Sequence, residues 1–103
     1  MLPLEALALA ASLMHQPMPD LDVLWLKRSP TRAECANARP VCYAMTATTK
    51  YEQWIIIAPP DAPAEILVHE ACHAIQTIRE GRPYSGRIAE AECEAVAARS
   101  EGR

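Results

Sequence analysis

The sequence predicts a small α+β domain in which an N-terminal helix, a three-stranded sheet and two further helices follow one another along 103 residues. Apolar residues recur at helical spacing at both ends of the chain, and three short runs rich in branched and aromatic residues lie between them. Prolines separate these regions. A chain of this length forms one core, so we assign residues 1–103 to a single domain.

Composition and charge narrow the classes of function. Half of the residues are apolar and 22% are charged, which is typical of a folded globular protein. Ten basic and thirteen acidic residues give a net charge of −3, and no segment gathers Lys and Arg in the way that phosphate binding requires. We therefore expect no nucleic-acid partner, and the sequence leaves the oligomeric state open.

The first element is an amphipathic helix predicted for Leu4–His15, which ends before Pro17. A secretory signal is the alternative, but no Lys or Arg precedes the apolar stretch and Glu5 interrupts it. The stretch is also too short to span a bilayer. We expect a cytoplasmic protein without a membrane span, and export stays open as the alternative.

Three strands are predicted for Leu21–Leu26, Val41–Thr49 and Tyr51–Ala58. The third contains Trp54–Ile57, a continuous apolar run of the kind found in well-buried strands. A turn at residues 49–51 joins the second strand to the third. The sheet is accordingly expected to be mostly antiparallel.

Two helices complete the chain. The first is predicted to run from about Ala62 to Glu80, with Asp61 as its N-terminal cap and with Gly81 and Pro83 at its end. The second runs from about Ser85 to Ser100. These two helices carry the residues that point to chemistry.

The sequence His69-Glu70-Ala71-Cys72-His73 lies on the first of these helices. His69 and His73 are one turn apart, so both imidazoles can reach one metal ion. Glu70 lies about 100° round the helix, where it can act on a metal-bound water without binding the metal. Zn²⁺ with Glu70 as the general base would hydrolyse a peptide bond through this water.

A helical wheel separates this motif from the expected core. His69, Glu70, His73 and Gln76 share one arc, opposite an arc of apolar residues: Ala64, Leu67, Val68, Ala71, Ala74, Ile75 and Ile78. The motif is therefore predicted to lie on a solvated face. Surface histidines without a function are the alternative interpretation.

A catalytic zinc ion usually takes three protein ligands, so a third must come from another element. On the wheel of the last helix Glu92 lies among apolar residues: Ile88, Ala89, Ala95 and Val96. A carboxylate on such a face is costly unless a cation compensates it. We therefore predict that His69, His73 and Glu92 bind the zinc ion.

Other arrangements of the acidic residues stay open. Glu90 can be the ligand instead, with Glu94 one turn on as a carboxylate that supports a zinc-bound imidazole. Otherwise both lie on a solvated face with Arg87. His15 is interpreted as a surface or packing residue.

The four cysteines do not decide the compartment, because none lies in a Cys-x-x-Cys spacing. Cys35 and Cys42 can close a short loop by a disulfide or remain two reduced thiols. Cys72 and Cys93 can pack as buried thiols between the last two helices, or a bridge can tie these helices together.

The pattern His69-Glu70-x-x-His73 followed by Glu92-Cys93-Glu94-Ala95 resembles the gluzincin metallopeptidases. It is most similar to their short forms, such as the minigluzincins, phage-type metallopeptidases and the ImmA/IrrE-like group. The resemblance spans about Ile66 to Ala98 and implies a small zincin-like domain with Glu92 as the third ligand. The position one turn after this ligand, often Asp or Asn in these families, is Val96.

This resemblance implies a zinc metalloendopeptidase that acts on a peptide or protein substrate. Tyr84, Arg82 and Arg87 are candidates for stabilising the oxyanion, because they lie between the two site helices. In such families an exposed edge strand holds the substrate, and Trp54–Ala58 can serve in this way or as a core strand. The rival hypothesis is a zinc-binding regulatory or protein-interaction module without turnover.

Overall fold

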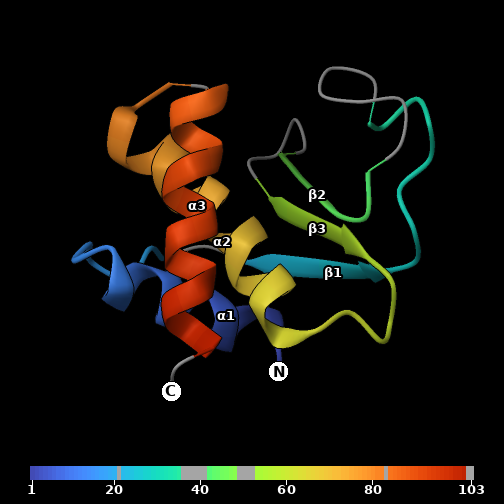
Figure 1. Ribbon diagram of the computed structural model, residues 1–103, viewed down its shortest axis with the longest axis horizontal. Coiled ribbons are helices and arrows are strands. Elements are labelled where there is room, and N and C mark those ends of the chain that lie inside the picture. The colour runs from blue at the N-terminus through green and yellow to red at the C-terminus, as the bar shows by residue number, and fades with distance from the viewer. Residues whose placement is uncertain (21, 36–41, 49–52, 83, 102–103) are drawn as a thin grey trace.

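The computed structural model of the protein describes residues 1–20, 22–35, 42–48, 53–82 and 84–101 (Figure 1). Within them lie three helices, α1 (Pro3–Leu13), α2 (Ala64–Glu80) and α3 (Arg87–Glu101), and three strands, β1 (Val23–Lys27), β2 (Met45–Thr48) and β3 (Trp54–Ala58). The predicted α+β class and the order of the elements are therefore confirmed. The predicted turn at residues 49–51 lies outside the described residues.

The sheet is mixed, with the strand order β1-β3-β2. β2 pairs with β3 in antiparallel fashion, with Met45 opposite Ile57, whereas β1 pairs with β3 in parallel, with Val23 opposite Trp54. The expectation of a mostly antiparallel sheet is therefore not met. A short turn constrains only strands that follow each other directly, and β1 reaches β3 through tertiary packing rather than through a hairpin.

β3 is the central strand and the most deeply buried one. Ile56, Ile57 and Ala58 are all at most 4% exposed, in agreement with the apolar run predicted for a well-buried strand. Because both edges of β3 are paired, this strand has no free edge for a further chain. β1 and β2 form the edges of the described sheet.

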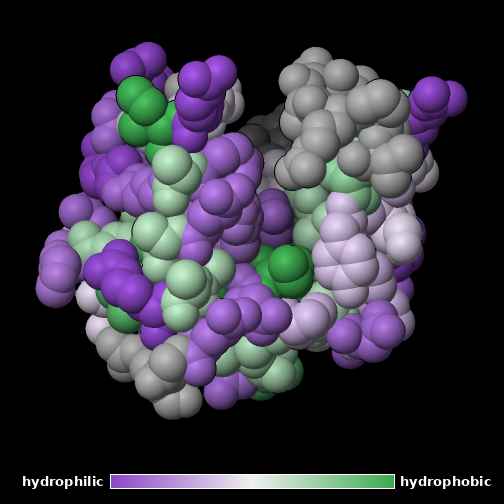
Figure 2. Space-filling view, in the orientation of Figure 1, coloured by the Kyte–Doolittle hydropathy of each residue, from purple (hydrophilic) through white to green (hydrophobic). Residues whose placement is uncertain are grey.

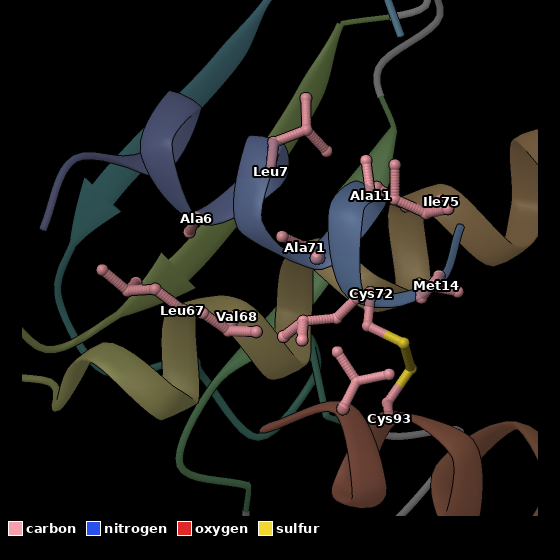
Figure 3. Close-up of a cluster of buried hydrophobic side chains, with 14 of the residues drawn as sticks. Ala6, Leu7, Ala11, Met14, Leu67, Val68, Ala71, Cys72, Ile75 and Cys93 are labelled. Atoms are coloured by element: carbon pink, nitrogen blue, oxygen red, sulfur yellow. A yellow bond between two sulfur atoms is a disulfide. The ribbon is translucent and has the colours of Figure 1, made fainter. Parts of the chain in front are cut away.

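The helices pack against one another on one side of the sheet (Figure 1). Small residues of α1, including Ala6 and Ala11, meet Ala71 of α2, and this allows the two helices to approach closely (Figure 3). Larger apolar side chains fill the space around this contact: Leu7, Met14, Leu67, Val68, Ile75 and Val96. No helix among the described residues is long and apolar enough to cross a membrane.

The local sequence signals of α2 predict its C-terminal end correctly but not its N-terminal cap. Gly81 adopts a left-handed conformation with φ 70°, and its N–H donates to the Thr77 carbonyl at 2.9 Å, so the predicted end of the helix is confirmed. The predicted cap is wrong, because the N-cap residue is Pro63 and no side chain caps the first turn. α2 therefore begins two residues later than expected, after the restricted backbone of Pro63.

All four cysteines are paired in disulfides, Cys35 with Cys42 and Cys72 with Cys93. The second bridge joins α2 to α3 in the helical core (Figure 3). The alternatives that the sequence left open are thus decided in favour of disulfides at both places.

Candidate metal centre

α2 presents the motif as one turn of helix. His69 and His73 are partly exposed, with side chains 18% and 19% exposed, and their ring centroids are 5.0 Å apart. Ligand atoms of His69, Glu70 and His73 all lie within 4.8 Å of one another. This group of side chains can therefore hold a metal ion.

Glu90 of α3 approaches both imidazoles from the opposite side. Its Oε2 lies 3.1 Å from the Nε2 of His69, and its Oε1 lies 2.9 Å from the Nε2 of His73. Glu90 lies in the first turn of α3, where a negative charge also favours the helix. Two imidazole nitrogens and one carboxylate thus converge on the same point between α2 and α3.

Glu92 lies elsewhere and has other partners. Arg79 donates to both of its carboxylate oxygens at 2.8 and 2.9 Å, and Gln76 Nε2 donates to its Oε1 at 2.8 Å. The hydrogen bonds from Arg79, more than any other interaction, hold the pKa of Glu92 below its ordinary value. The cation that compensates Glu92 is therefore an arginine, and the contacts favour Glu90, the alternative ligand, over Glu92.

The buried face of α3 differs from the predicted one, and this explains why Glu90 rather than Glu92 contacts the histidines. Ile88 was expected in the apolar face, but it is 77% exposed, and Ala95 is exposed as well. The buried residues are Ala89, Cys93, Val96 and Ala97. The core face is thus centred near Cys93, which is bonded to α2, and Glu92 lies at its flank rather than within it.

Glu70 is buried against β2, with only 8% of its surface exposed. The hydroxyl of Thr46 on β2 lies 2.7 Å from Glu70 Oε1 and 2.8 Å from the Glu70 carbonyl oxygen. Burial raises the pKa of Glu70, and the hydrogen bond from Thr46 opposes this rise. The expectation that Glu70 lies on a solvated face is therefore wrong, because β2 covers it.

Gln76 also departs from the predicted wheel. It was grouped with the solvated arc, but it is fully buried between α2 and α3. Conversely, Ala64 and Ile78 were placed in the core arc and both are exposed. A wheel cannot show which side of a helix a neighbouring helix will cover, so the sequence carried no signal for this buried amide.

The remaining candidates lie away from the imidazoles. His15 is exposed after the end of α1, and Glu94 is exposed on α3. Tyr84 lies against Arg79, with the guanidinium 5.7 Å from the ring centroid, and Arg82 and Arg87 are exposed. No contact found among the described residues joins Tyr84, Arg82 or Arg87 to the histidines.

The motif lies between β2 and α3, because Thr46 of β2 and Glu90 of α3 contact it from two sides. Figure 2 shows that the surface is hollowed between α3 and the strands, with hydrophilic residues along the α3 side. The site is thus built from three elements that are separate in the sequence. Solvent reaches both imidazoles, whereas Glu70 is largely covered.

Comparison of the chain with protein-family models, with curated proteins and with solved structures gave no match. The geometry of the site is therefore the basis for its function. It brings together two imidazoles and the buried Glu70 carboxylate, a group that can hold a metal ion, with the Glu90 carboxylate beside them.

Proposed function

We propose that the protein is a zinc-dependent metallopeptidase in which His69, His73 and Glu90 bind the metal and Glu70 is the general base. The observation that carries this proposal is the convergence of both Nε2 atoms on the Glu90 carboxylate, at 3.1 and 2.9 Å. Two imidazoles and one carboxylate form a three-ligand set that leaves a coordination position for water or substrate.

The chemistry of these donors fits zinc, because imidazole nitrogen and carboxylate oxygen are ordinary zinc ligands. Four such side chains meet here among the residues described, and with Glu70 as the base rather than a ligand, the other three would leave one position of the metal open. Because all four cysteines are in disulfides, the chain has no free thiol that would compete for the metal. The proposed ligand set differs from the one predicted by sequence only in the third residue.

Glu70 would transfer the proton of the attacking water during the reaction. A bound zinc ion would lower the pKa of a water molecule and polarise the carbonyl of the substrate. Glu70 would take the proton of the attacking water and pass it to the leaving amine. Its burial raises its pKa and so makes it a stronger proton acceptor than an exposed carboxylate. Thr46 holds one oxygen of this carboxylate at 2.7 Å.

The position of β2 supports a peptide substrate. β2 is an edge strand of the described sheet and is joined to the motif through Thr46. An extended peptide can pair with such an edge by main-chain hydrogen bonds. The sequence had suggested Trp54–Ala58 for this role, but β3 is central and paired on both sides, so the role passes to Met45–Thr48.

The disulfides bear on the compartment. Two disulfides in a domain of this size favour an oxidising environment, because thiols are kept reduced in the cytoplasm. We therefore propose that the protein works outside the cytoplasm, in place of the location expected from the sequence. Reaction of the purified native protein with a thiol reagent tests this, because free thiols in protein isolated from its natural source would contradict it.

The proposed function is tested by metal analysis of the purified protein and of variants of three glutamates. We expect about one zinc ion per chain in the wild type, loss of zinc in Glu90→Ala and retention in Glu94→Ala, the matched exposed residue of the same helix. Glu70→Gln is expected to keep zinc but to lose cleavage of unfolded protein substrates.

The outcomes separate the hypotheses. Absence of zinc in the wild type, or equal zinc contents in Glu90→Ala and Glu94→Ala, would contradict the proposed site. Zinc binding without cleavage of any unfolded protein or peptide would replace the peptidase by the rival, a zinc-binding module without turnover.

A further inference from the structure

We infer that Gln76 is a positioning residue that holds His73 with a proton on Nδ1, so that Nε2 is the nitrogen available to a metal. Glu92 and Arg79 keep the Gln76 amide in the orientation that this requires. The inference deepens the proposed function, and its consequence for metal binding rests on that function. The proton on Nδ1 is itself a property of the chain without metal.

The observations centre on one buried amide. Gln76 is 0% exposed, and its Oε1 lies 3.0 Å from Nδ1 of His73. Its Nε2 donates to the Ala89 carbonyl at 2.9 Å and to Glu92 Oε1 at 2.8 Å. A buried amide is costly unless its groups are paired, and here both ends of the amide have partners.

The partners determine which end of the amide faces His73. The carbonyl of Ala89 and the carboxylate of Glu92 only accept hydrogen bonds, so the NH₂ group of Gln76 must face them. The Oε1 atom is then left for His73. Since an amide oxygen only accepts, Nδ1 of His73 must be the donor.

This assignment leaves Nε2 of His73 on the side of the metal ligands. In the metal-free chain Nε2 donates to Glu90 Oε1 at 2.9 Å, because a carboxylate only accepts, and a bound metal ion would replace this proton. A hydrogen bond from the distant nitrogen of a ligating histidine sets its tautomer and the direction of its ring. Gln76 therefore prepares His73 for a metal ion before one binds.

Arg79 and Glu92 complete the arrangement. Arg79 donates to both carboxylate oxygens of Glu92, which holds the carboxylate in place for Gln76. Glu92 and Ala89 belong to α3, whereas Arg79, Gln76 and His73 belong to α2. The residue predicted as a metal ligand thus acts on the site through Gln76 rather than by direct contact.

The residues that the sequence suggested for supporting a metal-binding imidazole do not contact one within the described part of the chain. Glu94, expected to support an imidazole if Glu90 is a ligand, is exposed, and Val96 is buried and apolar. Gln76, one turn after His73 on the same helix, takes this position instead.

The first test measures the protonation of the His73 ring by long-range ¹H–¹⁵N correlation spectra of the metal-free protein. We expect a proton on Nδ1 in the wild type and faster exchange or loss of this proton in Gln76→Met, which keeps the length of the side chain but replaces the amide by a thioether, a much weaker acceptor. A wild-type His73 with an unprotonated Nδ1 would overturn the inference, as would an unchanged Nδ1 signal in Gln76→Met.

The second test measures Zn²⁺ affinity by competition with a chelator. We expect Gln76→Met to bind about 10- to 100-fold more weakly than the wild type and Glu94→Gln to bind equally well. Wild-type affinity in Gln76→Met would contradict the positioning role. If the wild type binds no zinc, the proposed function fails, and the ring spectra still decide the inference about Gln76.

A third variant guards against loss of folding in Gln76→Met. Glu92→Gln keeps the buried amide but removes the charged partner that orients it, and the Glu92 side chain is 35% exposed. We expect a circular dichroism spectrum of the folded protein, with faster exchange of the His73 Nδ1 proton and a smaller loss of Zn²⁺ affinity. Nδ1 exchange and affinity identical to those of Glu94→Gln would contradict the role of Glu92.

Discussion

Cys72 of α2 is bonded to Cys93 of α3. Cys72 directly precedes His73 in the sequence, and Cys93 follows Glu90 by less than one helical turn. The sulfur of Cys93 lies 3.6 Å from Nδ1 of His73. The bridge thus joins the two halves of the candidate metal site at the point where they meet. Relative sliding of α2 and α3, which would separate Glu90 from the histidines, is restrained by a covalent bond.

Removal of this bridge is expected to weaken both stability and metal binding. In the Cys72→Ala/Cys93→Ala variant, we expect the free energy of unfolding to fall by about 3 kcal/mol, because the bridge closes a loop with a sequence separation of 21. Urea unfolding monitored by circular dichroism measures this loss. Zn²⁺ affinity should fall as well, because Glu90 is then less firmly placed.

The other bridge provides the control. Cys35 and Cys42 have a sequence separation of only 7, so we expect Cys35→Ala/Cys42→Ala to lose about 2 kcal/mol. This variant should retain its Zn²⁺ affinity, because the bridge holds no metal ligand. Equal losses of affinity in the two double variants would show that the effect on the metal site is not specific to Cys72–Cys93.

Glu70 is expected to make the metal-free protein less stable as the pH rises. Burial raises its pKa in the folded state above the value of about 4.3 in the unfolded chain. The folded state therefore binds more protons between these two pKa values, and stability is lost as the pH rises from the unfolded value through the folded one. Glu70→Gln should therefore be more stable than the wild type at neutral pH. Thermal unfolding across pH measures the difference, which should shrink on acidification; a constant difference would contradict the assignment.

Glu92 is expected to show the opposite dependence. Its pKa is lowered in the folded state by Arg79, so its contribution is present above the unfolded pKa and is lost as the pH falls through the folded value. Glu92→Gln should lose up to about 1 kcal/mol at neutral pH, since the pair is partly screened by solvent. Urea unfolding at neutral and acid pH tests this, with Glu94→Gln as the control; a loss that persists in acid would count against it.

Zinc is expected to stabilise the folded protein through Glu90. A ligand that binds only the folded state at about 100 times its dissociation constant adds about 2.7 kcal/mol. Added Zn²⁺ should therefore raise the midpoint of thermal unfolding in the wild type, and a chelator should reverse this. The rise should be absent in Glu90→Ala and present in Glu94→Ala, and an equal rise in both variants would show that the ion binds elsewhere.

Local features of the sequence determined the elements and half of the site. The helices follow from apolar spacing, α2 ends at Gly81 because only this residue enters the left-handed conformation cheaply, and β3 follows from its apolar run. His69 and His73 lie together because residues four apart share one face of any helix. These relationships depend on neighbours in the chain and need no tertiary contact.

The tertiary structure alone decided the sheet order, the burial of Glu70 and which of Glu90 and Glu92 contacts the histidines. Each depends on which face of one element meets another, and that is set by packing between segments far apart in the sequence. α3 turns Cys93 toward α2, so Glu90 reaches the imidazoles and Glu92 reaches Arg79 and Gln76. A wheel drawn from Ile88 could not show this rotation, because the partner helix, and not the hydropathy of one residue, selects the buried face.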